Sequence, residues 1–157
     1  MFPNFNEERK LGRKGYNRVV GLDEVGRGSL AGPVMAAAVM IKPIRGRFVQ
    51  IRGIKDSKKL SPKKREELYK LIIKNPQIKW GIGRVSERVI DKINILEATK
   101  LAMERAVKKL EKKLKKKADF LILDGRMRIN LDTPQKSIIR ADDKVISCSI
   151  ASIIASY

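Results

Sequence analysis

The segment VVGLDEVGRG, residues 19–28, decides the expected fold. Its apolar start leads to two adjacent acids, Asp23 and Glu24, and glycines then flank Arg27. Residues 18–23 are predicted to form a strand that ends at the acid pair, and the glycines after it predict a turn. Two carboxylates at a strand end beside a glycine-flanked arginine indicate metal ions next to a phosphate backbone.

The rest of the chain alternates between strand and helix patterns. The patterns predict an antiparallel partner strand over 34–41, a loop over 43–53, a helix from Ser61-Pro62 to Asn75-Pro76, a strand over 80–85, one long helix from Ser86 to Lys117, strands over 120–123 and 137–140, and a last helix over 145–154. Residues 1–17 are expected to be a loose lead-in. This order predicts an α/β fold with a mixed five-stranded sheet and helices on its faces.

Length and charge narrow the class of protein. A chain of 157 residues is expected to form a single domain over 1–157 with its own core. The formal net charge is +19, which favours a polyanionic partner, and nucleic acid comes first. The lysine-rich run 108–117 is either a nucleic-acid contact or a solvated helix end.

The residue types that are missing exclude several chemistries. The chain has no histidine, so histidine-dependent triads and histidine–zinc sites are excluded. Cys148 is the sole cysteine and is expected to be buried rather than nucleophilic. No apolar run approaches the roughly 18 residues of a membrane span, and no signal-type segment opens the chain. We therefore expect a cytoplasmic protein with no membrane partner.

Four acids are predicted to lie at strand ends: Asp23, Glu24, Asp124 and Asp142. Each acid alone can be a cap or turn residue, and Asp124-Gly125 is a common turn dipeptide. Carboxylates that converge at one edge of a sheet repel each other and need cations, and hard oxygen ligands suit Mg²⁺ or Mn²⁺. The four acids therefore predict a site for two divalent ions that act on a phosphodiester.

Basic and glycine residues near these acids are candidate substrate contacts. The turn Gly26-Arg27-Gly28 would let the backbone approach a sugar, with Arg27 on a phosphate, although it is also a plain tight turn. Lys58, just before a predicted helix, could hold a phosphate or be ordinary surface charge.

Five ordered segments resemble the signature segments of the ribonuclease HII family. They are GLDEVGRG (21–28), LAGPV (30–34), DSKKLS (56–61), INILEAT (93–99) and Asp124-Gly125. The resemblance covers residues 18–155. It implies a ribonuclease H-like fold and an endoribonuclease, which cleaves the RNA strand of RNA–DNA hybrids and cuts 5′ of ribonucleotides embedded in duplex DNA, leaving 5′-phosphate and 3′-hydroxyl ends. Separately from the resemblance, we expect a monomer.

The resemblance also implies roles for individual residues. Asp23, Glu24, Asp124 and Asp142 would bind two Mg²⁺ or Mn²⁺ ions, with Asp143 as the alternative to Asp142. Gly26, Arg27 and Gly28 would sense the 2′-hydroxyl at an RNA–DNA junction, and Lys58 would lie near the scissile bond.

The family pattern continues beyond Tyr157, and the apolar helical pattern stops there without a closing residue, so we expect a C-terminally truncated chain. Two alternatives are an inactive fragment that binds hybrids and another nuclease of the same fold.

Overall fold

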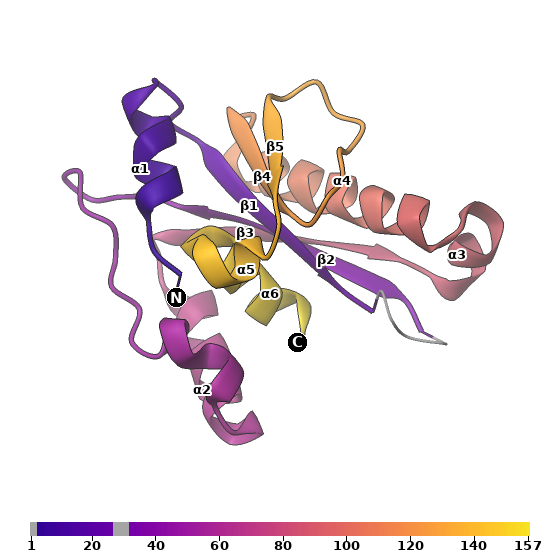
Figure 1. Cartoon of the computed structure of the whole chain (residues 1–157), viewed down its shortest axis with the longest axis horizontal. Helices are drawn as coiled ribbons and strands as arrows, with labels where there is room; N and C mark the ends of the chain where they lie inside the picture. The colour runs from indigo at the N-terminus through magenta and orange to yellow at the C-terminus, as the bar shows by residue number, and fades with distance from the viewer. Residues whose placement is uncertain (1–2, 27–31) are drawn as a thin grey trace.

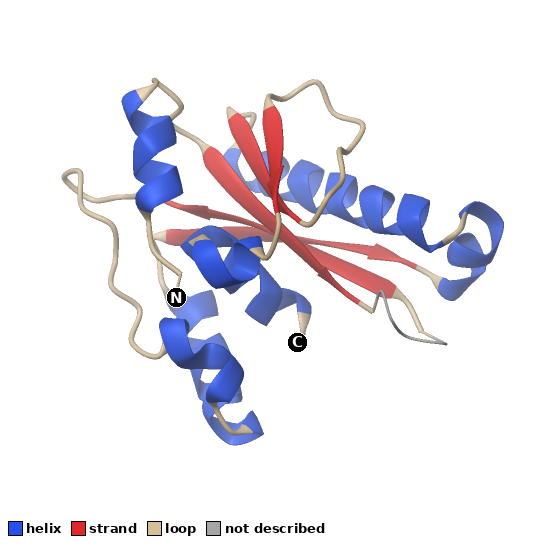
Figure 2. Ribbon diagram, in the orientation of Figure 1, coloured by secondary structure: helices blue, strands red, loops and turns tan. Residues whose placement is uncertain are grey.

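The structure is a computed structural model that describes residues 3–26 and 32–157, apart from the side chains of residues 55 and 56. Five strands form one sheet in the order β3-β2-β1-β4-β5 (Figures 1 and 2). The strands are β1 (Val19–Val25), β2 (Val34–Ile41), β3 (Ile78–Val85), β4 (Phe120–Asp124) and β5 (Gln135–Ile138). The helices are α1 (Asn6–Arg13), the 3₁₀ helix η1 (Ile54–Lys59), α2 (Pro62–Lys74), α3 (Glu87–Ile93), α4 (Ile95–Leu114), α5 (Ala141–Lys144) and α6 (Ile146–Ala155).

The sheet is mixed, as predicted. β2 pairs antiparallel with both β1 and β3, whereas β4 pairs parallel with β1 and with β5. In the β1–β4 ladder Leu22 lies opposite Leu123. The carboxyl ends of these two parallel strands therefore meet at one edge of the sheet, and each strand carries an acid there.

Helices cover both faces of the sheet (Figure 1). α4 packs on the face that includes Val20 and Leu22, and α6 and α2 pack on the other face. In β2 alternate residues serve the two cores: Ala36 joins the α4 side, and Ala37 joins the α6 side. Because both faces are covered, this strand reads as a continuous apolar run rather than an alternating one.

Local signals set the limits of several elements. Ser61 caps α2 by accepting a hydrogen bond from the Lys64 N–H at 3.3 Å, and Pro62 occupies the first turn. The α2 helix ends before Asn75, as predicted. On the apolar side of α2, Leu68 and Ile72 are buried, whereas Leu71 is 66% exposed.

Three predicted boundaries are wrong. Residues 6–13 form α1 rather than a loose lead-in, because Leu11 packs into a small core with β1 and β4. The long helix predicted from Ser86 is two helices, since Asn94 has a φ of 75° and its side chain caps α4. The fifth strand ends at Ile138, and Arg140 then adopts a left-handed φ of 57°.

Two further features of the chain are the burial of its cysteine and the length and hydropathy of its helices. Cys148 is fully buried, as expected. Within residues 3–26 and 32–157, no helix is both long enough and apolar enough to cross a membrane.

Candidate metal centre

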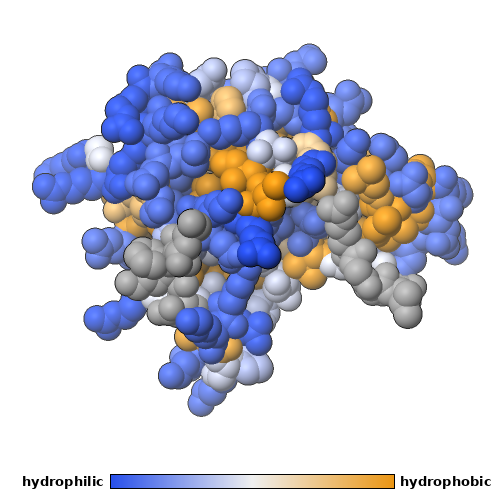
Figure 3. Space-filling view, in the orientation of Figure 1, coloured by the Kyte–Doolittle hydropathy of each residue, from blue (hydrophilic) through white to orange (hydrophobic). Residues whose placement is uncertain are grey.

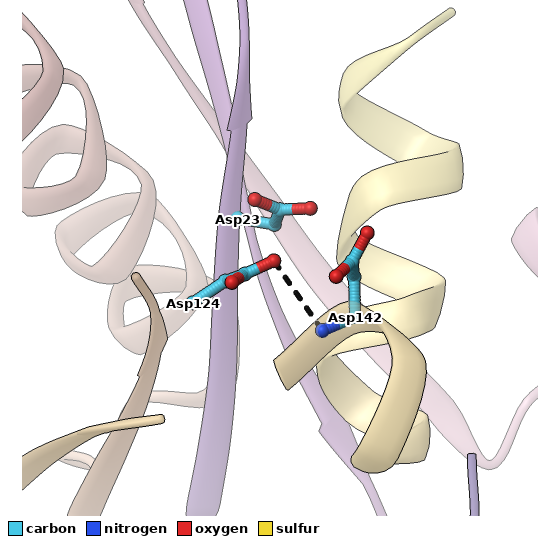
Figure 4. Close-up of side chains that lie close together, drawn as sticks. All are labelled: Asp23, Asp124 and Asp142. Carbon is cyan, nitrogen blue, oxygen red and sulfur yellow. Dashed lines mark hydrogen bonds between the residues drawn. The ribbon is translucent and has the colours of Figure 1, made fainter. Parts of the chain in front are cut away.

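Three aspartates from separate parts of the sequence converge at one edge of the sheet (Figure 4). Asp23 lies near the end of β1, Asp124 is the last residue of β4, and Asp142 lies on α5, which follows β5. One carboxylate oxygen from each lies within 4.8 Å of the others. The parallel pairing of β1 with β4 brings the first two together, and the turn after β5 brings the third.

Backbone hydrogen bonds fix the orientation of two of these carboxylates. Asp124 accepts hydrogen bonds from the backbone N–H groups of Ala141, at 3.2 Å, and Asp142, at 3.3 Å (Figure 4 shows the second). Asp23 Oδ1 accepts one from the Glu24 N–H at 2.8 Å. Asp124 thus ties the start of α5 to the end of β4, and this holds Asp142 beside the strand ends.

Burial and mutual repulsion disfavour the charged forms of two of the acids. Burial, together with the charges of Asp124 and Glu24, raises the pKa of Asp23 to about 9. Burial and the neighbouring Asp142 raise the pKa of Asp124 to about 7. A bound cation would relieve both effects, because it offsets the charge that burial penalises.

Lys58 gives Asp142 the opposite behaviour. Burial acts against the charged form of Asp142, but the hydrogen bonds to Lys58 and Asp124 and the charge of Lys58 together outweigh it and lower the pKa of Asp142. Lys58 Nζ lies 2.8 Å from Asp142 Oδ2 and 2.5 Å from Asp143 Oδ1. These bonds outweigh the partial burial of Lys58 and raise its pKa. Both acids pair with Lys58, but of the two only Asp142 is one of the three clustered aspartates.

The pKa shifts predict how the stability of the metal-free protein depends on pH. Well below pH 4, Asp23 and Asp124 are protonated in both the folded and the unfolded chain. Between pH 4 and 9 the unfolded chain has lost the Asp23 proton while the folded chain retains it, so the free energy of unfolding falls as pH rises. We expect the melting temperature in EDTA to be lower at pH 8 than at pH 5, and Mg²⁺ to raise it more at pH 8. A melting temperature in EDTA that rises from pH 5 to pH 8 would contradict this origin of the shifts.

Glu24 is not one of the three clustered acids in the described part of the chain. Side chains alternate along a strand, so Asp23 shares the face of Gly21 and Glu24 follows on the other face. Glu24 is nevertheless close enough for its charge to contribute to the raised pKa of Asp23.

The predicted turn after β1 is described only at its first residue. Gly26 has a φ of 102°, and a Cβ there would lie 2.6 Å from the Pro33 carbonyl oxygen. Glycine is therefore required at this position by both conformation and space. Arg27 and Gly28, which the sequence assigns to substrate binding, lie outside the described residues.

A cleft of about 320 Å³ lies beside Asp142, between η1, α2 and α6. Lys58 and Arg65 line it on one side, and Ser149 and Ser152 of α6 line it on the other. Cationic and hydroxyl groups of this kind are the usual contacts of a sugar–phosphate backbone.

The lysine-rich run 108–117 lies at a different place in the fold. It closes α4, where Lys113 donates to the Trp80 carbonyl oxygen at 2.7 Å. The Lys117 carbonyl accepts from Arg18, at the start of β1 rather than at its acidic end. The run therefore does not contribute to the aspartate cluster.

The sequence did not reveal two contacts near the site. One is the pairing of Lys58 with Asp143. The other is the hydrogen bond from the Ser147 N–H, at the start of α6, to Glu8, a buried acid on α1. The apolar residues Phe5 and Leu11, which are both buried in the structure, were the signal available for α1.

The family model and the curated relatives that match this chain carry the same description. Residues 20–157 match the family model described as Ribonuclease HII, and α1 precedes the matched segment. A ribonuclease HII of Syntrophotalea carbinolica is 42% identical over 148 residues, which are 94% of this chain and 66% of that protein. A ribonuclease HII of Chlamydia trachomatis is 45% identical over 148 residues, which are 94% of this chain and 64% of that protein. The chain thus spans about two thirds of the length of these curated relatives.

Solved structures share the fold. The ribonuclease HII of Archaeoglobus fulgidus, solved in complex with PCNA, superposes with a TM-score of 0.66 at 26% identity, over 88% of this chain and 71% of that chain. Bst ribonuclease HIII in complex with Mn²⁺ superposes with a TM-score of 0.69 at 21% identity, over 89% of this chain and 51% of that chain.

Proposed function

The chain belongs to the ribonuclease HII family, and on that premise we propose that it is a metal-dependent endoribonuclease. Its proposed substrates are the RNA strand of RNA–DNA hybrids and single ribonucleotides within duplex DNA, cut on their 5′ side. The observation that carries the proposal is the convergence of Asp23, Asp124 and Asp142 within 4.8 Å.

The donor set fits hard divalent cations. The cluster offers carboxylate oxygens, and the raised pKa values of Asp23 and Asp124 favour an added positive charge between them. We propose that these three aspartates, with Glu24 as a fourth ligand, hold two Mg²⁺ or Mn²⁺ ions. Bound ions of this kind neutralise a phosphate and lower the pKa of water.

The residues around the cluster would bind and orient the nucleic acid. Lys58 and Arg65 would contact phosphates along the cleft beside Asp142, and the hydroxyls of Ser149 and Ser152 would contact sugar or phosphate oxygens. Hydrophilic side chains cover most of the face drawn in Figure 3, as expected for a protein of net charge +19 with a polyanionic substrate. The turn Gly26-Arg27-Gly28 is proposed to read the 2′-hydroxyl.

Replacing Lys58 by alanine is expected to weaken substrate binding, because one phosphate contact is lost. The slope of log affinity against log salt should become shallower by about one unit. Binding of a labelled hybrid in EDTA, measured at several salt concentrations, gives this slope. Lys63→Ala, an exposed lysine on α2, serves as the matched control. An unchanged slope for Lys58→Ala would remove Lys58 from the binding surface.

The proposed function is tested by cleavage of three labelled duplexes: an RNA–DNA hybrid, a DNA duplex with one ribonucleotide, and an all-DNA duplex. We expect cuts in the first two with Mg²⁺ or Mn²⁺, and none in EDTA. The single-ribonucleotide duplex should be cut on the 5′ side of the ribonucleotide.

The same assay separates the alternatives. Cleavage of the all-DNA duplex at a comparable rate would indicate another nuclease of the same fold. Binding of the hybrid without cleavage would indicate a hybrid-binding fragment.

A further inference from the structure

A buried acid in α1 holds the first turn of α6. Glu8 is 5% exposed, and its Oε2 accepts a hydrogen bond from the Ser147 N–H at 3.0 Å. Burial raises the pKa of Glu8, and the bond from Ser147 offsets only part of that shift. Burying a carboxyl group is costly, so its partner on α6 indicates what the acid contributes.

The start of α6 has no cap of its own. Its N-cap residue, Val145, has no side-chain acceptor, and the first turn contains no acid. The first N–H groups of a helix need acceptors from elsewhere. The Ile146 N–H donates to the Asn4 carbonyl at 3.1 Å, and the Ser147 N–H donates to Glu8. Asn4 and Glu8 therefore supply acceptors for the first two N–H groups of α6.

The same N-terminal segment contacts the chain on both sides of Asp142. On one side, Glu7 pairs with Lys136 of β5. On the other side, the Asn4 N–H donates to the Lys144 carbonyl at 3.2 Å, and Val145 alone separates α5 from α6. Asp142 lies between these contacts, so its place beside the strand ends depends on where α6 begins.

The first turn of α6 is also pressed against the strand that carries Asp23. A Cβ on Gly21 would lie 2.4 Å from Ser147 Oγ and 2.7 Å from the Cys148 nitrogen. Gly21 precedes Asp23 by two residues on the same strand face. The bond from Ser147 to Glu8 thus holds α6 in contact with β1, close to the point from which Asp23 projects.

We propose that Glu8 is a positioning residue of the metal centre, because its bond to Ser147 sets the start of α6 and thereby the distance of Asp142 from Asp23. The inference rests on the proposed function, since it requires the aspartate cluster to bind divalent ions. Glu8 touches neither substrate nor ion in this account.

Glu8→Met tests the role, because methionine fills a similar volume without an oxygen acceptor. The change leaves the buried Ser147 N–H without its acceptor, so the melting temperature is expected to fall modestly, as for the loss of one buried hydrogen bond. The dissociation constant for Mn²⁺, measured by calorimetry on the metal-free protein, should rise about tenfold. Glu8→Gln keeps an amide oxygen for the Ser147 N–H and should stay within about twofold of the parent protein.

Met103→Ala is the matched control for general destabilisation. Met103 is fully buried on α4, on the opposite face of the sheet. This variant should have a lower melting temperature but an unchanged affinity for Mn²⁺. If Glu8→Met binds Mn²⁺ as tightly as the parent protein, or Met103→Ala loses as much affinity as Glu8→Met, the inference is overturned. If the parent protein and Asp23→Asn give the same Mn²⁺ titration, the proposed metal centre itself is wrong.

Discussion

Asp23→Asn is expected to reduce cleavage by about 10³-fold or more, because it removes the most buried acid of the cluster and a proposed ligand of the ions. The same change should stabilise the metal-free protein. Asparagine carries no charge to be penalised by burial or by Asp124, the causes that raise the pKa of Asp23 to about 9. A gain of roughly 1 kcal/mol would raise the melting temperature by about 2–4 °C.

Single-turnover cleavage and thermal melting in EDTA measure these two effects. Asp91→Asn is the matched control, since Asp91 is an exposed acid on α3. It should leave both the cleavage rate and the melting temperature unchanged. A rate for Asp23→Asn equal to that of the parent protein would refute the assigned role of Asp23.

Gly83→Ala is expected to cause the largest loss of stability. A Cβ at this position would lie 1.9 Å from the Ala102 carbonyl oxygen and 2.6 Å from the Ala106 nitrogen. Both atoms are backbone atoms of α4, so no side-chain rotation can relieve the overlap, and the helix has to move off β3. We expect a loss of about 3 kcal/mol or more in the free energy of unfolding, measured by urea denaturation.

Gly12→Ala is the control for this experiment. A Cβ on Gly12, within α1, would meet nothing within 4 Å. Alanine favours a helix over glycine, so this variant should gain up to about 1 kcal/mol. If Gly83→Ala unfolds at the same urea concentration as the parent protein, α4 does not pack on β3 as closely as described.

Local sequence signals predicted much of the sheet. The apolar run 34–41 coincides with β2, and Ser61 with Pro62 marks the start of α2. Strand–helix alternation predicted a mixed sheet, and in the structure the parallel pairing of β1 with β4 brings Asp23 and Asp124 to one edge of it.

The features that the sequence did not reveal depend on tertiary contacts. α1 is short, and its burial relies on Val19 and Ile122 in other elements. The break before α4 depends on the single left-handed residue Asn94 within an otherwise helical pattern. Near the site, Lys58 and Asp143 are 85 residues apart, and the distance between Glu8 and Ser147 is 139 residues. No local pattern links residues so far apart.

The position of bound Mn²⁺ tests the central claim most directly. Crystals grown or soaked with Mn²⁺ and measured at a wavelength where manganese scatters anomalously would locate the ions. We expect an anomalous peak among the carboxylates of Asp23, Asp124 and Asp142, at metal–oxygen distances of about 2.0–2.4 Å. Ordered crystals containing Mn²⁺ at other sites, with no peak among these three aspartates, would contradict the assignment of the cluster as the metal centre.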